Sequence, residues 1–142
     1  MIYLDTGCLL KLYYPEPQSN RVAQLVNGQL IAYTPLHELE LTNALELKRF
    51  RKEATLAQVR ATLALVEGDA RAGVLSRTPI DWDSALREST ALAKAYSHIT
   101  GSRSLDLMHC AAAHQLAISA FLTTDERQRR VAQKLGLRCP AV

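Results

Sequence analysis

Three short apolar runs, each followed at once by the start of a helix, constrain the fold most. They are IYLD at residues 2–5, LIAYT at 30–34 and AFLTT at 120–124. Short strands that alternate with helices form parallel sheets covered by helices on both faces. The sequence therefore predicts an α/β fold around a short parallel sheet, with LRCP at 137–140 as a last short strand.

Helix boundaries follow from capping residues and prolines. Pro15 and Pro17 stop the first helix, and Pro35 stands at a first helical position. Ser19 and Thr55 are the expected caps of two further helices. With 142 residues and no linker-like stretch, the chain is predicted to form a single domain, residues 1–142. The predicted helices cover residues 6–14, 19–28, 35–52, 55–73, 82–99, 104–119 and 125–136.

Two aspartates follow predicted strands directly. Asp5 ends the first run and Asp125 comes after the late one. Ligands of parallel sheets bind in the crevice at the carboxyl ends of the strands, so both side chains are expected in one crevice. Each also suits a helix N-cap, and Gln128 stands three residues after Asp125 as in a capping box. Taken alone, each position favours capping.

Two further carboxylates are candidates for the same crevice. Asp106 lies in the first turn of the helix 104–119, which is apolar on nearly every face and is expected to be buried. An unpaired buried carboxylate is costly, so a cation partner is expected there, although helix capping is the alternative. Glu38 and Glu40 point in nearly opposite directions on a helix, and the apolar neighbours mildly favour Glu40 as the inward one.

Four carboxylates with few competing histidines or cysteines suit a hard divalent cation. Mg²⁺ prefers oxygen ligands and is commonly held by one or two carboxylates and several waters, and Mn²⁺ accepts the same set. Such a site can orient and acidify a water for attack on a phosphodiester. His109 lies three residues after Asp106, where it is expected to support that carboxylate or to pack in the core.

At these residues the chain resembles the PIN-domain ribonucleases, and most closely the VapC toxins of bacterial toxin–antitoxin pairs. The resemblance covers essentially the whole length. It rests on the order and spacing of IYLDTGCLLKLYYPEP at the start, ELTNAL at 40–45, SLDLMHCAAAH at 104–114, FLTTDERQ at 121–128 and the closing GLRCP.

The resemblance implies a PIN fold with a parallel sheet of four or five strands, and a Mg²⁺- or Mn²⁺-dependent endoribonuclease. It also implies a homodimer held inactive by a small VapB-like antitoxin, whose C-terminal segment lies over the acidic crevice. The family's metal ligands and catalytic acids fall on Asp5, Glu40, Asp106 and Asp125.

The resemblance places supporting side chains on Thr6, Asn43 and Thr123, whose hydrogen bonds would orient the ligating carboxylates. Thr6 can instead simply start the first helix, and Asn43 can be an ordinary polar helix residue. Many relatives have serine where this chain has Gly7, so one hydroxyl near the first aspartate is missing.

The charge balance fits a polyanionic substrate. The net charge is +3, and setting the four acids aside as ligands leaves a surface of about +7. Two basic runs are candidates for RNA contact, with solvated helix faces as the alternative. They consist of Lys48, Arg49, Arg51 and Lys52, and of Arg127, Arg129 and Arg130.

The sequence favours a cytoplasmic location. No apolar run approaches the roughly 18 residues of a membrane span, and the N-terminal residues lack the basic lead of a signal peptide. Cys8, Cys110 and Cys139 have no CxxC spacing and are expected to be free thiols.

Two other functions compete with the nuclease. HAD-type aspartyl-phosphate hydrolases also place an aspartate after the first strand, but they need a second acid two residues later, where this chain has Gly7. The second is a non-catalytic PIN-like module that binds RNA or a partner protein. Such a module is expected to lack a ligand carboxylate, and the presence of all four argues against it.

Overall fold

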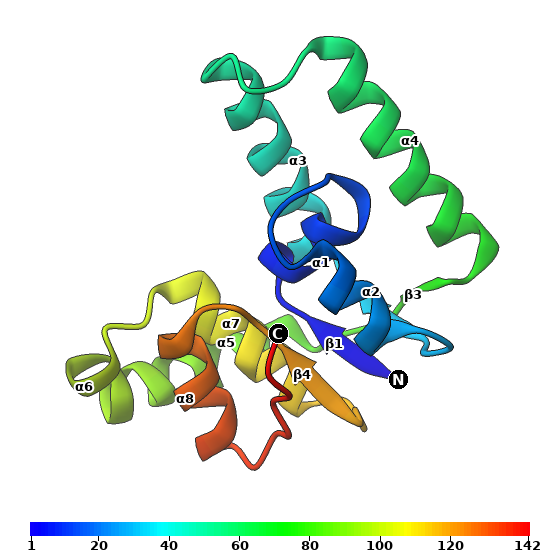
Figure 1. Cartoon of the computed structure of the whole chain (residues 1–142). Coiled ribbons are helices and arrows are strands. Elements are labelled where there is room, and N and C mark those ends of the chain that lie inside the picture. The colour runs from blue at the N-terminus through cyan, green and yellow to red at the C-terminus, as the bar shows by residue number, and fades with distance from the viewer.

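The computed structural model describes all 142 residues and has a four-stranded parallel sheet at its centre (Figure 1). The strands are β1 (Ile2–Leu4), β2 (Ile31–Tyr33), β3 (Leu75–Arg77) and β4 (Ala120–Leu122), in the order β3-β2-β1-β4. The helices are α1 (Thr6–Tyr13), α2 (Ser19–Val26), α3 (Pro35–Phe50), α4 (Leu56–Ala72), α5 (Trp82–Leu92), the π-helical η1 (Ala93–Ser97), α6 (His98–Thr100), α7 (Ser104–His114) and α8 (Glu126–Lys134).

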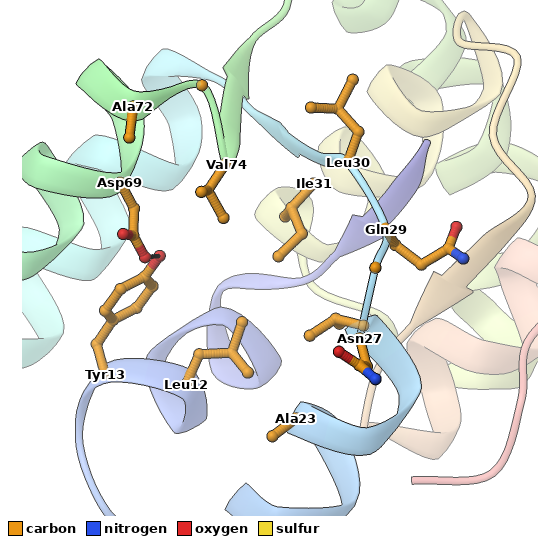
Figure 2. A pocket seen from close by; sticks show the side chains of 13 residues that line it. Leu12, Tyr13, Ala23, Asn27, Gln29, Leu30, Ile31, Asp69, Ala72 and Val74 are labelled. Atoms are coloured by element: carbon orange, nitrogen blue, oxygen red, sulfur yellow. Dashed lines mark hydrogen bonds between the residues drawn. The ribbon is translucent and has the colours of Figure 1, made fainter.

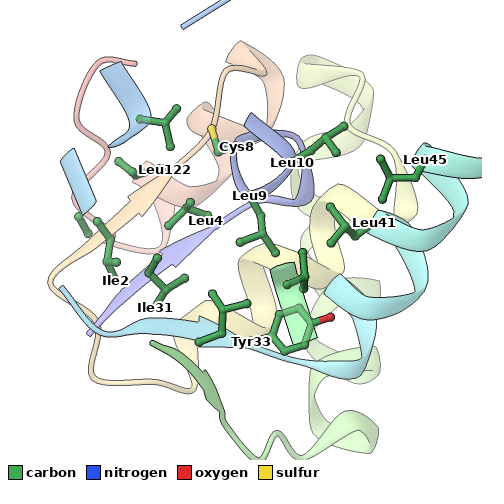
Figure 3. Close-up of a cluster of buried hydrophobic side chains, with 14 of the residues drawn as sticks. Ile2, Leu4, Cys8, Leu9, Leu10, Ile31, Tyr33, Leu41, Leu45 and Leu122 are labelled. Atoms are coloured by element: carbon green, nitrogen blue, oxygen red, sulfur yellow. The ribbon is translucent and has the colours of Figure 1, made fainter. Parts of the chain in front are cut away.

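Alternate residues of the strands face two separate hydrophobic clusters, as expected for a parallel sheet covered on both sides. In β1, Ile2 and Leu4 face a cluster built with α1 to α4, which Figure 3 shows. The intervening Tyr3 faces a second cluster, formed with α5, α7 and α8. The predicted α/β fold with helices on both faces is therefore confirmed.

β1 and β2 separate toward their carboxyl ends. β1 pairs with β4 at three successive positions but with β2 only at Ile2–Ile31. The carbonyl oxygen of Leu4 instead accepts a hydrogen bond of 2.7 Å from His37 Nε2, in the first turn of α3. A side chain thus replaces the sheet partner at the end of β1, next to Asp5.

Helix caps explain where α3 and α4 begin. Thr34 caps α3 with Pro35 at the first position, and Thr55 and Gln58 form a reciprocal capping box on α4. The two helices form a hairpin that extends away from the sheet (Figure 1). No helix of the chain is both long enough and apolar enough to cross a lipid bilayer.

Several predicted boundaries were wrong. Residues 137–140 form no strand, because their one backbone hydrogen bond to a strand runs from Phe121 N–H to the Arg138 carbonyl. The helix predicted over 104–119 ends at His114. The one predicted over 82–99 is broken by the π-helical turn η1. Ser19 is the first helical residue of α2 rather than its cap, and its hydroxyl accepts from Glu16 N–H.

Candidate active site

A polar hollow of about 390 Å³ lies at the carboxyl ends of β1 and β4. None of the residues that line it is hydrophobic, and all four predicted carboxylates are among them. Asp5 follows β1, Asp125 precedes α8, and Glu40 and Asp106 come from α3 and α7. The lining residues are Asp5, Thr6, Gly7, Glu40, Arg103, Asp106, His109, Thr124, Asp125 and Gln128; we call this hollow the acidic pocket.

Asp5 caps a helix and lines the pocket at the same time. Its Oδ1 accepts a hydrogen bond of 2.7 Å from Cys8 N–H, so it is the N-cap of α1. Its side chain is nonetheless part of the pocket wall, because a carboxylate has two oxygens. Burial raises the pKa of Asp5, and the Thr123 hydroxyl and the Cys8 amide oppose the increase. The capping and ligand interpretations of this position are compatible.

Glu40 is held in place by two side-chain donors. Thr6 Oγ1 donates to Glu40 Oε2 at 2.9 Å, and His109 Nε2 contacts the same oxygen. Burial alone would raise the pKa of Glu40, but the hydrogen bonds from His109 and Thr6 outweigh it and leave the pKa below its ordinary value. Glu38, by contrast, is exposed and pairs with Arg77, so Glu40 is the inward glutamate.

His109 joins Glu40 to Tyr3. A carboxylate only accepts, so Nε2 carries the hydrogen that faces Glu40. Tyr3 Oη lies 2.9 Å from Nδ1, and burial raises the pKa of this phenol, which keeps it protonated. His109 was expected to support Asp106 or to pack in the core. It is buried, but its polar partners are Tyr3, Thr6 and Glu40.

His37 is a second buried histidine, and its backbone partners fix its tautomer. Its Nδ1 accepts from Thr34 N–H at 3.1 Å, so Nε2 carries the hydrogen donated to Leu4. Burial, together with the nearby His109, lowers the pKa of His37 to about 3, which keeps the ring neutral. The ring lies 4.9 Å from that of His109, centroid to centroid.

Arginines neutralise the other side of the pocket. Arg103 Nε donates to Asp106 Oδ2 at 3.0 Å and its Nη2 to Oδ1 at 3.4 Å. Arg127 Nη2 donates to Asp125 Oδ2 at 2.8 Å, and this hydrogen bond is the main cause that lowers the pKa of Asp125. Asp125 also caps α8 through Arg127 N–H and Gln128 N–H, as its spacing predicted.

The donor chemistry of the pocket fits a hard divalent cation. Four carboxylates supply only oxygen, and the buried Oε1 of Gln128 in the same wall has no hydrogen-bond donor within the chain. However, no three carboxylate, histidine or cysteine side chains are gathered closely enough to hold one ion among themselves. The arrangement therefore suits an ion bound by one or two carboxylates, with waters bridging to the others.

The predicted supporting residues are placed differently from one another. Thr6 contacts Glu40, and Thr123 is buried beside Asp5, with its hydroxyl accepting from Asp125 N–H at 2.9 Å. Asn43 is exposed and makes no hydrogen bond to any of the four acids. The structure thus brings the two threonines to the carboxylates but not the asparagine.

The predicted RNA-contacting residues are mostly engaged in contacts within the chain. Lys48 lies 2.7 Å from Glu16, and Arg129 donates to the carbonyls of Thr123 and Pro140. Arg49, Arg127 and Arg130 pair with Glu46, Asp125 and Glu126. Only Arg51 and Lys52, at the turn between α3 and α4, form no ion pair and are exposed.

The sequence interpretation missed Arg103 and His37. The spacing of Arg103 and Asp106 is three residues at a helix start, which is a recognisable signal for a pair across the first turn. His37 stands three residues after Thr34, which is the position of a capping-box partner, so this spacing is the signal that identifies it.

A second, larger hollow of about 600 Å³ opens near the amino ends of β2 and β3 (Figure 2). Most of its lining is hydrophobic, including Leu12, Leu30 and Val74. Its one carboxylate, Asp69, already accepts a hydrogen bond of 2.8 Å from Tyr13. Size alone would favour this hollow, but the chemistry favours the acidic pocket.

Comparison with known proteins agrees with this fold. FitAcB from Neisseria gonorrhoeae superposes with a TM-score of 0.67 over 99% of this chain and 97% of that chain, at 15% sequence identity. No curated protein matches the sequence. The model of the PIN domain family matches residues 2–134. This chain belongs to the PIN domain family.

Proposed function

We propose that the chain is a Mg²⁺- or Mn²⁺-dependent endoribonuclease of the VapC toxin type. The observation that carries the proposal is the convergence of Asp5, Glu40, Asp106 and Asp125, from segments far apart in sequence, on one pocket without a hydrophobic residue. PIN domains are generally nucleases, and this donor set suits a divalent cation rather than a covalent nucleophile.

Asp5, Glu40, Asp106 and Asp125 would hold the cation, directly or through water. When bound, the cation would supply an acidified water and stabilise charge on a phosphodiester. Thr6 and His109 fix the position of Glu40, so its carboxylate needs no reorganisation on binding. Cys8 N–H does the same for Asp5.

The remaining parts of the proposal concern substrate and partners. A surface with more basic than acidic groups outside the pocket suits RNA, and Arg51 and Lys52 are the exposed residues of the two basic runs that form no ion pair. A VapB-like antitoxin, a homodimer and a cytoplasmic location complete the proposal by the resemblance to VapC toxins.

Asp5→Asn and Asp106→Asn are expected to reduce cleavage of structured RNA by at least about a hundredfold, because each removes a carboxylate from the pocket. Cleavage would be followed on gels with purified protein in Mg²⁺ or Mn²⁺, with and without chelator. Asp69→Asn, which alters a hydrogen-bonded aspartate outside the pocket, is the matched control. Full cleavage by both pocket variants, or wild-type cleavage that ignores chelator, would refute the nuclease.

One observation favours a second candidate, a PIN-like module that binds RNA or a partner without cleaving. Asp106 and Asp125 are already paired with arginines, and no three acids are close together. The same samples discriminate the two. RNA that is bound by wild type but left intact at every concentration of Mn²⁺ would support the binding module.

A further inference from the structure

We propose that Arg103 is a displaceable counter-ion of the acidic pocket, which competes with the divalent cation for Asp106 and Asp125 and so lowers the affinity for that cation. This inference rests on the proposed function only for the presence of a cation site. It concerns a residue that belongs to the chain itself and lines the pocket.

Arg103 contacts the carboxylate oxygens that a cation would bind. Its Nε and Nη2 each donate to a different oxygen of Asp106, and its backbone N–H donates to Oδ2 at 3.2 Å. The same Nη2 lies 3.7 Å from Asp125 Oδ2. One guanidinium therefore spans two of the four carboxylates, while neither Asp5 nor Glu40 contacts a lysine or arginine.

Little besides these carboxylates holds the guanidinium in place. The side chain of Arg103 is 69% exposed, and its guanidinium donates hydrogen bonds only to Asp106. Because the guanidinium already lies largely in solvent, it can rotate away from Asp106 without uncovering the core. The backbone hydrogen bond that caps α7 remains when the side chain moves.

Arg103 and a divalent cation compete for these oxygens. The guanidinium occupies a lone pair on each oxygen of Asp106, and two cations a few ångströms apart repel each other. Cation binding at Asp106 or Asp125 is therefore favoured when Arg103 rotates out toward solvent. Arg127 also pairs with Asp125 but touches no second carboxylate, so its displacement frees one acid only.

Calorimetric titration of Mn²⁺ into the purified 142-residue chain tests this. Arg103→Gln removes the competitor and is expected to lower the Kd for Mn²⁺ by about tenfold. Arg103→Lys keeps the charge but loses the fork that reaches two oxygens, so its Kd should fall between the two. Arg130→Gln removes a charge that pairs only with Glu126, and it controls for long-range electrostatics.

An unchanged or weaker affinity in Arg103→Gln, or an equal gain in Arg130→Gln, would overturn the proposal, as would a lack of Mn²⁺ binding by all variants. Circular dichroism would verify that each variant is folded. RNA cleavage is measured separately. Tighter Mn²⁺ binding by Arg103→Gln in a protein that cleaves no RNA would uphold the counter-ion and refute only the nuclease.

Discussion

At the scale of single residues, the carboxylates of the pocket differ in how the chain supports them. Asp5 is buried and its pKa is raised, whereas the pKa values of Glu40 and Asp125 are lowered by their hydrogen-bond donors. The pocket thus combines one acid that resists ionisation with two that are held ionised. A bound cation would favour the ionised form of Asp5.

Thr6→Val tests the support of Glu40. Valine keeps the shape of threonine but removes the hydroxyl that donates to Glu40 Oε2. The free energy of unfolding, measured in urea at neutral pH, should therefore fall by about 1–2 kcal/mol. Because the folded-state pKa of Glu40 is depressed, the contribution is present above its ordinary pKa of 4.5 and is lost as pH falls through the folded-state value.

The difference in the free energy of unfolding between wild type and Thr6→Val should therefore vanish in strong acid. Thr42→Val, an exposed threonine on α3, serves as the control and should match wild type at every pH. A destabilisation by Thr6→Val that is the same at neutral and acid pH would show that the hydroxyl does not act through the Glu40 carboxylate.

Residue chemistry also shows what the sequence could and could not predict about the site. Asp5 and Asp125 follow strands, so the rule for parallel sheets placed them in one crevice. The contact between Glu40 and His109 joins α3 to α7, and no local pattern predicts which side chains of two distant helices meet. His109 is buried, as one of the two alternatives expected, but its polar partners lie on other elements and could not be read from its own helix.

At the scale of elements, the caps predicted at Thr55 and Asp125 were correct, whereas the cap predicted at Ser19 was wrong. Thr34, Thr55, Asp81 and Asp125 each cap the helix that follows, because short polar side chains satisfy the first free amides of a helix. The strand predicted at residues 137–140 was wrong, because a strand also needs a neighbouring strand that pairs with it in register. There the chain makes one backbone bond to β4 and no ladder.

Thr55→Ala is expected to destabilise the chain by about 1 kcal/mol, because it removes the cap of α4 and leaves Gln58 N–H without its acceptor. Thermal or urea unfolding measures this loss. Thr55→Asn retains a capping oxygen and should recover most of it. Equal stability of the alanine variant and wild type would mean that the capping box contributes nothing.

At the scale of the whole molecule, the two layers of helices hold the acids together against their mutual repulsion. Asp5 at the N-cap of α1 and Glu40 in α3 belong to one layer, and Asp106 in α7 and Asp125 at the N-cap of α8 belong to the other. Two hydrophobic clusters on opposite faces of the sheet fix these layers relative to each other. Cation binding should therefore be coupled to global stability.

Mn²⁺ is expected to raise the melting temperature of the wild-type chain in proportion to the logarithm of its concentration above Kd, because only the folded state gathers the four carboxylates. Scanning calorimetry with and without Mn²⁺ measures this. Asp106→Asn should show a smaller increase, and Asp69→Asn the same increase as wild type. A melting temperature indifferent to Mn²⁺ would contradict a cation site in this pocket.

The order of the strands has a consequence for the timing of biosynthesis. β1 is made first, yet its neighbour β4 and the last carboxylate, Asp125, lie beyond residue 119. A nascent chain that is still being translated can assemble α1 to α4 around β1 and β2, but one flank of β1 stays bare. The acidic pocket therefore cannot be complete until the residues after β4 have been synthesised, so any activity of the pocket is withheld for most of translation.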